Sequence, residues 1–220
     1  MADLILSVLG TKGGVGKTTI ARLTANGLAI AGWRTKVYDL DRSTHSQTAW
    51  HSTRLQNGFD LLFQVEQVKT VEQAVKDAAH YDAAVIDGFA KASQTAAETG
   101  KVSDGILLPT GVSDDELFPA IVLANTLVRE QGVSARRIRF VVNRTGDSHQ
   151  EVNDARRRIE EAGYTAFYRS IQYKTGYRSA ANLGKTPLET SHPSLNKKAQ
   201  DLVDEIGEWI GEILSEKEAA

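Results

Sequence analysis

A glycine-rich stretch near the N-terminus holds the residue types that bind phosphate. It spans residues 10–19 and comprises Gly-Thr-Lys-Gly-Gly-Val-Gly-Lys-Thr-Thr. Glycines lack a Cβ, so the backbone N–H groups of such a loop can turn inward and approach an anion closely. An apolar run precedes the loop at residues 4–9, and a helical pattern follows it from residue 20. The order of strand, glycine loop and helix predicts a phosphate-binding loop rather than an ordinary turn.

Lys17 and Thr18 stand where the helix after this loop is expected to begin. The Lys17 ammonium can reach the β- and γ-phosphates of a nucleotide, and the Thr18 hydroxyl can bind Mg²⁺. We therefore predict a nucleotide site with Mg²⁺ in this stretch. Its expected contact residues are Thr11, Lys12, Gly13, Gly14, Val15, Gly16, Lys17, Thr18 and Thr19.

Length and composition indicate one globular domain over residues 1–220. Hydrophobic residues make up 41 % of the 220, and cysteine is absent, which excludes disulfides and thiolate metal sites. No apolar run approaches the roughly 20 residues that a membrane-spanning helix needs. The first strand pattern begins almost at once, without the pattern of a signal peptide, so we expect a cytoplasmic protein.

Apolar strand patterns alternate with helical patterns along the whole chain. This alternation predicts an α/β fold, with a mostly parallel twisted sheet covered by helices on both faces. Ligands of such sheets bind at the carboxyl ends of the strands. The expected strands are residues 4–9, 35–39, 61–65, 83–87, 105–109 and 138–143. The expected helices after the first are residues 45–54, 71–79, one from 113, 150–162, 175–182 and 195–214.

Carboxylates follow two of these strands at the edge where the loop lies. Asp39 ends one strand and Asp41 comes just after it, while Asp87 ends another. A carboxylate at the position of Asp87 can hold Mg²⁺ through a water molecule. For Asp41 a plain helix-capping role is the alternative.

The form of the phosphate loop resembles one protein family in particular. Residues 12–19 read K-G-G-x-G-K-T-T, similar to the deviant Walker A loop of the ParA/MinD ATPases, with Thr11 at the usual first glycine. The resemblance implies ATP as the ligand and an ATP-dependent homodimer. It also implies that Lys12 contacts the nucleotide of the other subunit and acts with Lys17 in catalysis. A solvated lysine at the loop entrance is the alternative for Lys12.

The segment after the second strand resembles the D-x-D-P-Q motif of the same family. Asp41 matches the aspartate that positions the attacking water and contributes to the metal site, whereas Arg42 and Ser43 replace Pro-Gln. Gln47 and Trp50 match a downstream polar position and a tryptophan of the family.

Two later strand ends extend this resemblance. Residues 81–87 resemble the Walker B strand, with Asp87 as the metal carboxylate and Gly88-Phe89-Ala90 in place of T-P-P. Asn143, followed by Arg144, stands where the family reads the adenine edge. An amide can pair with a base edge through both of its polar atoms. The alternative for Asn143 is a residue that only forms a turn.

Positive charge is concentrated in one part of the chain. Residues 136–198 carry a net charge of +7, although the whole chain has a net charge of −2. Such a segment is a candidate surface for nucleic acid, and in DNA-binding members of the resembled family basic residues of this region contact phosphates. The candidates here are Arg169, Lys174 and Arg178. Part of the charge, such as residues 156–158, fits a solvated helix face equally well.

Residues 195–214 carry an apolar stripe at helical spacing and an acidic opposite face, which anionic lipid would repel. We therefore expect a helix that packs on the sheet and no membrane partner. The resemblance as a whole implies a short ParA-type ATPase that binds DNA non-specifically and positions a plasmid, chromosome or protein cargo through a ParB-like or other adaptor. The alternatives are a MinD-like membrane-cycling regulator of division, an organelle-positioning ATPase of the carboxysome type, and a metabolic P-loop enzyme.

Overall fold

A computed structural model describes residues 2–41, 45–88 and 94–219 of the chain. Arg42, Ser43, Phe89 and Ala90, where the sequence departs from the family pattern, lie outside the described residues. The strands are β1 (Leu4–Val8), β2 (Thr35–Asp39), β3 (Gln64–Gln67), β4 (Ala83–Asp87), β5 (Gly105–Thr110), β6 (Ile138–Thr145), β7 (Thr165–Ala166) and β8 (Ile171–Gln172). The helices are α1 (Lys17–Ile30), α2 (Ser46–Gln56), α3 (Val71–Ala78), α4 (Gln94–Val102), α5 (Asp114–Arg129), α6 (His149–Glu161), α7 (Thr175–Asn182) and α8 (Pro193–Glu218), with short 3₁₀ turns at Ala135–Arg137 (η1) and Pro187–Glu189 (η2).

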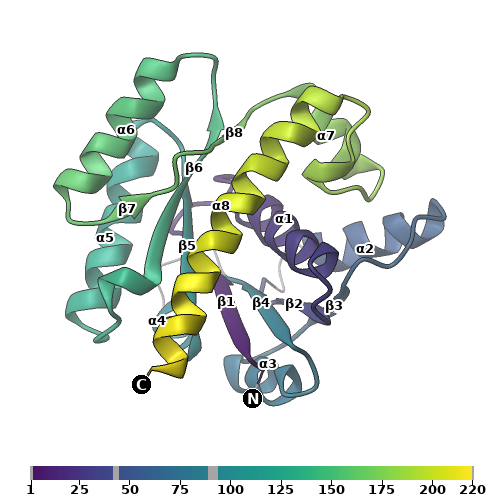
Figure 1. Ribbon diagram of the computed structural model, residues 1–220, viewed down its shortest axis with the longest axis horizontal. Coiled ribbons are helices and arrows are strands. Elements are labelled where there is room, and N and C mark those ends of the chain that lie inside the picture. The colour runs from purple at the N-terminus through teal and green to yellow at the C-terminus, as the bar shows by residue number, and fades with distance from the viewer. Residues whose placement is uncertain (1, 42–44, 89–93, 220) are drawn as a thin grey trace.

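The strands form one twisted sheet in the order β3-β2-β4-β1-β5-β6-β7, with β8 also paired to β6 (Figure 1). Every pairing found among the described residues is parallel. The prediction of an α/β fold with a mostly parallel sheet is therefore confirmed. Because β1 lies at the centre, the loop that follows it opens at the middle of the carboxyl edge.

Helices cover both faces of this sheet because the strand residues alternate between two apolar cores. Leu4, Leu6 and Val8 of β1 pack in one core with residues of α1 and α8. Ile5 points to the opposite face, where it packs with residues of α3. The same opposite face is extended by α4, α5 and α6, which pack on β5 and β6 (Figure 1). Burial on both faces explains why the central strands have continuous apolar sequences.

The last helix packs on the sheet, as its apolar stripe predicts. Leu202, Ile206 and Trp209 of α8 are buried in the core that α1 shares. A Cβ at Gly105 of β5 would lie 2.7 Å from the Trp209 ring, so this glycine lets the helix approach the sheet closely. The helix begins earlier than predicted because Pro193 occupies its first turn, where a missing N–H costs nothing. None of the helices in the described ranges combines the length and the apolar character that crossing a bilayer requires.

Other sequence-based expectations also differ from the structure, which has two short strands, β7 and β8, that were not predicted. Residues 61–65 were expected as a strand, but β3 covers Gln64–Gln67, a polar edge strand. Phe63 precedes this strand and stacks on Trp50 with ring centroids 5.7 Å apart, so its apolar character reflects packing on α2. Helix α4 was not predicted, because it buries only small or polar residues such as Ala96 and Thr99.

Candidate functional site

The loop between β1 and α1 has the backbone of a phosphate cradle. Gly14 and Gly16 have φ angles of 82° and 96°, a left-handed conformation that side chains disfavour. A Cβ at Gly16 would lie 1.9 Å from Nδ2 of Asn143, so glycine is required here on steric grounds as well. Helix α1 begins directly after, at Lys17. The first N–H groups of this helix have no acceptor within the helix, and an anion bound in the loop would accept their hydrogen bonds.

Lys17 folds back over this loop. Its ammonium donates to the backbone carbonyl of Lys12 at 3.0 Å, which places the charge inside the loop. Burial lowers the pKa of Lys17 from its usual value, and the carboxylates of Asp87 and Asp41 act in the opposite direction. Lys12 itself is exposed, as are Gly13 and Gly14 beside it. The structure thus brings the two lysines to one loop, with Lys17 turned inward and Lys12 at the surface.

Thr18 and Asp87 meet at the base of the loop. The Thr18 hydroxyl donates to Oδ2 of Asp87 at 2.8 Å. The other carboxylate oxygen, Oδ1, is buried and has no hydrogen-bond partner within the described ranges. Burial raises the pKa of Asp87 to about 6. A hydroxyl beside a carboxylate with an unsatisfied oxygen is a donor set that fits Mg²⁺, whose remaining ligands would come from phosphate and water.

Asp39 and Asp41 lie at the end of β2, the strand next to the one that carries Asp87. Asp39 is paired in register with Asp87 across β2 and β4, and it accepts the backbone N–H of Asp41 at 2.9 Å. Asp41 is half-buried and close enough to Lys17 to influence its pKa. The structure therefore places Asp41 at the loop, as predicted, while its contact with a metal or an attacking water stays a prediction.

Gln47 connects this carboxylate pair to α2. Its side-chain N–H donates to Oδ2 of Asp87 at 3.0 Å, and its backbone N–H donates to Asp39 at 3.3 Å. Sequence reasoning singled out Gln47 and Trp50 but missed Arg22, whose Nε donates to the side-chain amide oxygen Oε1 of Gln47 at 2.8 Å. No signal in the sequence separates Arg22 from a surface arginine, because it lies beside the apolar stripe of α1 and not within it.

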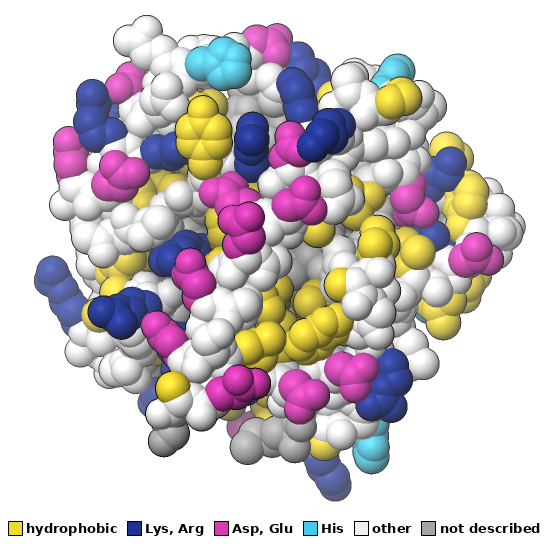
Figure 2. Space-filling model, viewed as in Figure 1, with side chains coloured by type: hydrophobic (Ala, Val, Ile, Leu, Met, Phe, Trp, Pro, Cys, Tyr) yellow, Lys and Arg dark blue, Asp and Glu magenta, His cyan; other side chains and the backbone are white. Residues whose placement is uncertain are grey.

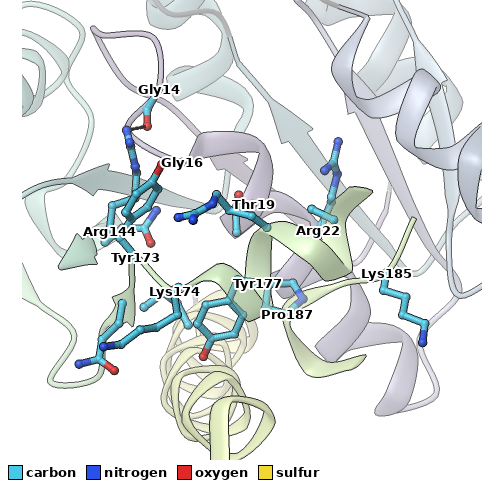
Figure 3. A pocket seen from close by; sticks show the side chains of 15 residues that line it. Gly14, Gly16, Thr19, Arg22, Arg144, Tyr173, Lys174, Tyr177, Lys185 and Pro187 are labelled. Carbon is cyan, nitrogen blue, oxygen red and sulfur yellow. Dashed lines mark hydrogen bonds between the residues drawn. The ribbon is translucent and has the colours of Figure 1, made fainter. Parts of the chain in front are cut away.

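A pocket of about 270 Å³ opens beside the loop (Figure 3). Gly14, Gly16 and Thr19 form one wall, and residues of β8, α7 and the segment after α7 form the others. The pocket thus adjoins the phosphate cradle at the side where the rest of a nucleotide would extend. Among its remaining lining residues are Arg22, Asn143, Arg144, Tyr173, Lys174, Tyr177, Arg178, Lys185 and Pro187.

Asn143 also lines the pocket, and one polar atom of its side chain has no partner within the described residues. Its Nδ2 donates to the carbonyl of Val15 at 2.9 Å, whereas its buried Oδ1 has no partner among the described residues. An unpaired amide oxygen accepts a hydrogen bond from an amino group such as that of adenine. Arg144, with a φ of 55°, donates to the carbonyl of Gly14 and closes the loop from outside. Both residues therefore contact the phosphate loop, and their contact with a nucleotide base stays a prediction.

The three predicted DNA contacts do not lie together. Lys174 and Arg178 line the pocket just described, and the guanidinium groups of Arg178 and Arg144 lie 4.5 and 4.9 Å from the ring centroid of Tyr173. Lys174 is also paired with Asp147 at 2.6 Å. Arg169 lines a different cleft, of about 460 Å³, with Arg156, Tyr168 and Lys198. Sequence reasoning missed Tyr173, whose role depends on how β8 and α7 fold over the loop.

Comparison with known proteins agrees with this geometry. The model of a family described as the CobQ/CobB/MinD/ParA nucleotide binding domain matches residues 6–188. No curated protein sequence matches the chain significantly.

Solved structures with the same fold include the cell division ATPase MinD of Pyrococcus furiosus, 18 % identical over 94 % of this chain and 99 % of that one, with a TM-score of 0.69. Cyanothece McdA in complex with ATP is 16 % identical over 94 % of this chain and 98 % of that one, with a TM-score of 0.68. A Borrelia burgdorferi protein described as a plasmid partition protein, bound to AMPPNP, is 14 % identical over 90 % of this chain and 97 % of that one, with a TM-score of 0.66.

These likenesses concern the fold, whereas the family match covers most of the sequence and includes the loop, both aspartate-ended strands and Asn143. The chain belongs to the CobQ/CobB/MinD/ParA family of nucleotide-binding domains.

Proposed function

We propose that this protein is a Mg²⁺-dependent ATPase of the partition type. In this proposal it binds ATP and forms a homodimer with the nucleotides in the interface. The dimer binds DNA without sequence preference, so the ATP-bound protein is associated with the nucleoid. A ParB-like or other adaptor then stimulates hydrolysis and releases it. The cargo is a plasmid, a chromosome or a protein body.

The exposed side chain of Lys12 is the observation that carries this proposal. The backbone carbonyl of Lys12 accepts a hydrogen bond from Lys17, whereas the side chain of Lys12 is exposed at the surface of the phosphate loop. A second lysine beside Lys17 has little to do in a monomer, where like charges repel. Across a dimer interface the ammonium of Lys12 can contact the phosphates bound to the other subunit. An ordinary P-loop enzyme has no need of this second cation.

The carboxylate arrangement supports hydrolysis as the chemistry. Asp87 and Thr18 would hold Mg²⁺, which neutralises charge on the β- and γ-phosphates. Asp41, at the end of β2 and close to Lys17, is the candidate for positioning water. The Pyrococcus horikoshii MinD structure, which has the same fold, was solved with Mg-ADP, and the Borrelia protein with AMPPNP.

The distribution of charge supports DNA as a partner. Figure 2 shows acidic side chains along α8, and several Lys and Arg side chains, with acidic ones among them, at the end of the molecule where α6, β8 and α7 lie. Arg169 and Lys198 are exposed there, and the guanidinium groups of Arg156 and Arg169 lie 4.9 and 5.3 Å from the ring centroid of the exposed Tyr168. Cations of this kind contact phosphates without reading sequence. Because Lys174 and Arg178 line the nucleotide pocket, Arg169 is the one of the three predicted DNA contacts that can test DNA binding without touching ATP.

A mobility shift on unrelated duplexes, with ATP, with ADP and without nucleotide, tests the proposal. We expect a shift only with ATP, the same on every sequence, and weaker by at least tenfold between low and physiological salt. Arg169→Glu should weaken it severalfold while ATP binding stays unchanged. Arg136→Glu is the matched control: it makes the same change of charge in the same basic segment, but on η1, which precedes β6 at the amino edge of the sheet.

The contrary result is also well defined. If no DNA shifts with ATP even at low salt, and the protein instead sediments with anionic liposomes when ATP is present, the MinD-like alternative replaces the partition proposal. Equal effects of Arg169→Glu and Arg136→Glu would show that net charge, and not the cleft at Arg169, drives binding.

A further inference from the structure

A buried cation lies between α1 and α2, outside the phosphate loop. The Arg22 side chain is about nine-tenths buried, and its Nη2 donates to the backbone carbonyl of Ser46 at 2.7 Å. Its Nε donates to Oε1 of Gln47 at 2.8 Å, and the guanidinium lies 4.7 Å from the ring centroid of Trp50. Within the described ranges it forms no ion pair. The carboxylates of Asp87 and Asp39 are near enough to act on this charge, but burial still lowers the pKa of Arg22, so the guanidinium is held in this position at a cost.

Both ends of the Gln47 amide are fixed by this cation and by the metal carboxylate. Arg22 donates to the amide oxygen, which obliges the amide nitrogen to face Oδ2 of Asp87. Thr18 donates to the same oxygen, so Oδ2 is held by two donors. The remaining oxygen, Oδ1, is thereby the one left to face a metal or its water shell. Gln47 is fully buried, so solvent cannot replace either contact.

We propose that Arg22 is a positioning residue for the magnesium site and acts through Gln47. Its planar fork holds the first turn of α2 and the Gln47 amide in one geometry, which in turn fixes the rotation of the Asp87 carboxylate. This inference rests on the proposed function in one respect: it takes Asp87 and Thr18 as the residues that hold Mg²⁺.

Helix α2, which carries Gln47, also contacts the wall of the nucleotide pocket. Trp50 donates its ring N–H to the carbonyl of Lys185 at 3.2 Å, and Arg54 donates to the carbonyl of Gly184 at 3.0 Å. Lys185 lines the pocket, on the side away from Arg144 (Figure 3). The position of α2 is therefore shared by the metal carboxylate and the pocket wall. Trp50, in contact with Arg22, is a natural fluorescent reporter of that position.

The test compares the affinity for fluorescent ADP in EDTA with the affinity in excess Mg²⁺. Arg22 also lines the pocket, so its substitution can change the affinity for ADP directly. The ratio of the two dissociation constants cancels that change and leaves the contribution of Mg²⁺. We expect Arg22→Met and Gln47→Met each to reduce the gain in affinity from Mg²⁺ by about tenfold. The double variant should lose no more than either single one, because both act through one contact. Arg34→Met, at an exposed guanidinium paired with Asp82, is the control.

Two results would overturn the proposal. If Arg22→Lys keeps the full gain in affinity from Mg²⁺, a positive charge is sufficient and the planar guanidinium is not required. If the effects of Arg22→Met and Gln47→Met are additive, Arg22 does not act on Asp87 through Gln47. A second readout is the Trp50 signal on adding Mg²⁺ to nucleotide-free protein, assigned by subtracting Trp50→Phe. We expect it in the wild type and not in Gln47→Met, and its persistence there would contradict the inference. This readout needs no nucleotide, so a wild type that binds no ADP would refute only the proposed function.

Discussion

Asp39 and Asp87 lie opposite each other in register at the carboxyl ends of β2 and β4, and Gln47 donates to both of them. Burial raises the pKa of each carboxyl group above its usual value. The two acids share one edge of the sheet, where Lys17 lies close enough to interact with the charge of Asp87 and Arg22 with the charges of both. A site built in this way is costly while empty of metal, and Mg²⁺ together with phosphate would relieve that cost.

Asp87→Asn should therefore stabilise the metal-free protein at neutral pH. Asp87 has a folded-state pKa of about 6, above its ordinary 3.8, so its protonated form favours folding below pH 4 and this contribution is lost as the pH rises through 6. The loss is on the order of 2–3 kcal/mol at pH 7.5, and asparagine avoids it. Denaturant unfolding in EDTA at pH 7.5 and at pH 4 measures the difference, which should vanish at the lower pH.

Asp82→Asn is the control for this prediction. The hydrogen bond and charge of Arg34 lower the pKa of Asp82, so its substitution should give no gain in stability at neutral pH. A lower stability of Asp87→Asn than of wild type in EDTA at pH 7.5 would mean that Asp87 is ionised at little cost.

Lys17→Ala should weaken ATP binding by more than tenfold, which corresponds to more than about 1.4 kcal/mol. The substitution removes the ammonium inside the phosphate loop and its bond to the Lys12 carbonyl. Titration with a fluorescent ATP analogue measures the change. Lys101→Ala, at an exposed position of α4, should leave the affinity unchanged. Equal affinities of the Lys17 variant and the wild type would refute the phosphate-loop assignment.

The sequence predicted the parts of this site that follow one another along the chain. The phosphate loop, the acids after β2 and β4, and Asn143 at the end of its strand each stand beside an apolar run that is itself easy to identify. A parallel sheet brings the ends of such runs to one edge, so their proximity followed from fold class alone.

Contacts between elements distant in sequence could not be predicted in this way. Arg22 meets Gln47 only because α1 and α2 pack together, and nothing in the period of α1 distinguishes it from a surface arginine. Lys174 and Arg178 were grouped with Arg169 because all three are basic residues of the segment that the family resemblance assigns to DNA contacts. The structure separates them because β8 and α7 turn over the phosphate loop and carry these two side chains to the nucleotide pocket.

Lys12→Ala and Asp41→Ala should separate dimer formation from hydrolysis. Lys12 is exposed and its carbonyl, which Lys17 uses, is kept by alanine, so ATP binding by the monomer should change little. Without its ammonium the contact across the interface is lost, and light scattering with ATP should show a monomer. The backbone N–H of residue 41 donates to Asp39, and alanine keeps this hydrogen bond. Alanine removes the carboxylate proposed to position water, so Asp41→Ala should bind ATP, form the dimer and hydrolyse slowly.

The comparison of the two variants decides the mechanism because each serves as the control for the other. Both are single alanine substitutions beside the same loop, and both leave the Thr18–Asp87 contact in place. A general disturbance of the loop would impair both in the same assay. Opposite behaviour, a monomer for Lys12→Ala and a persistent ATP-bound dimer for Asp41→Ala, requires that the lysine acts across the interface and the aspartate on the reaction. Normal ATP-dependent dimerisation of Lys12→Ala would show that this lysine does not cross to a second subunit.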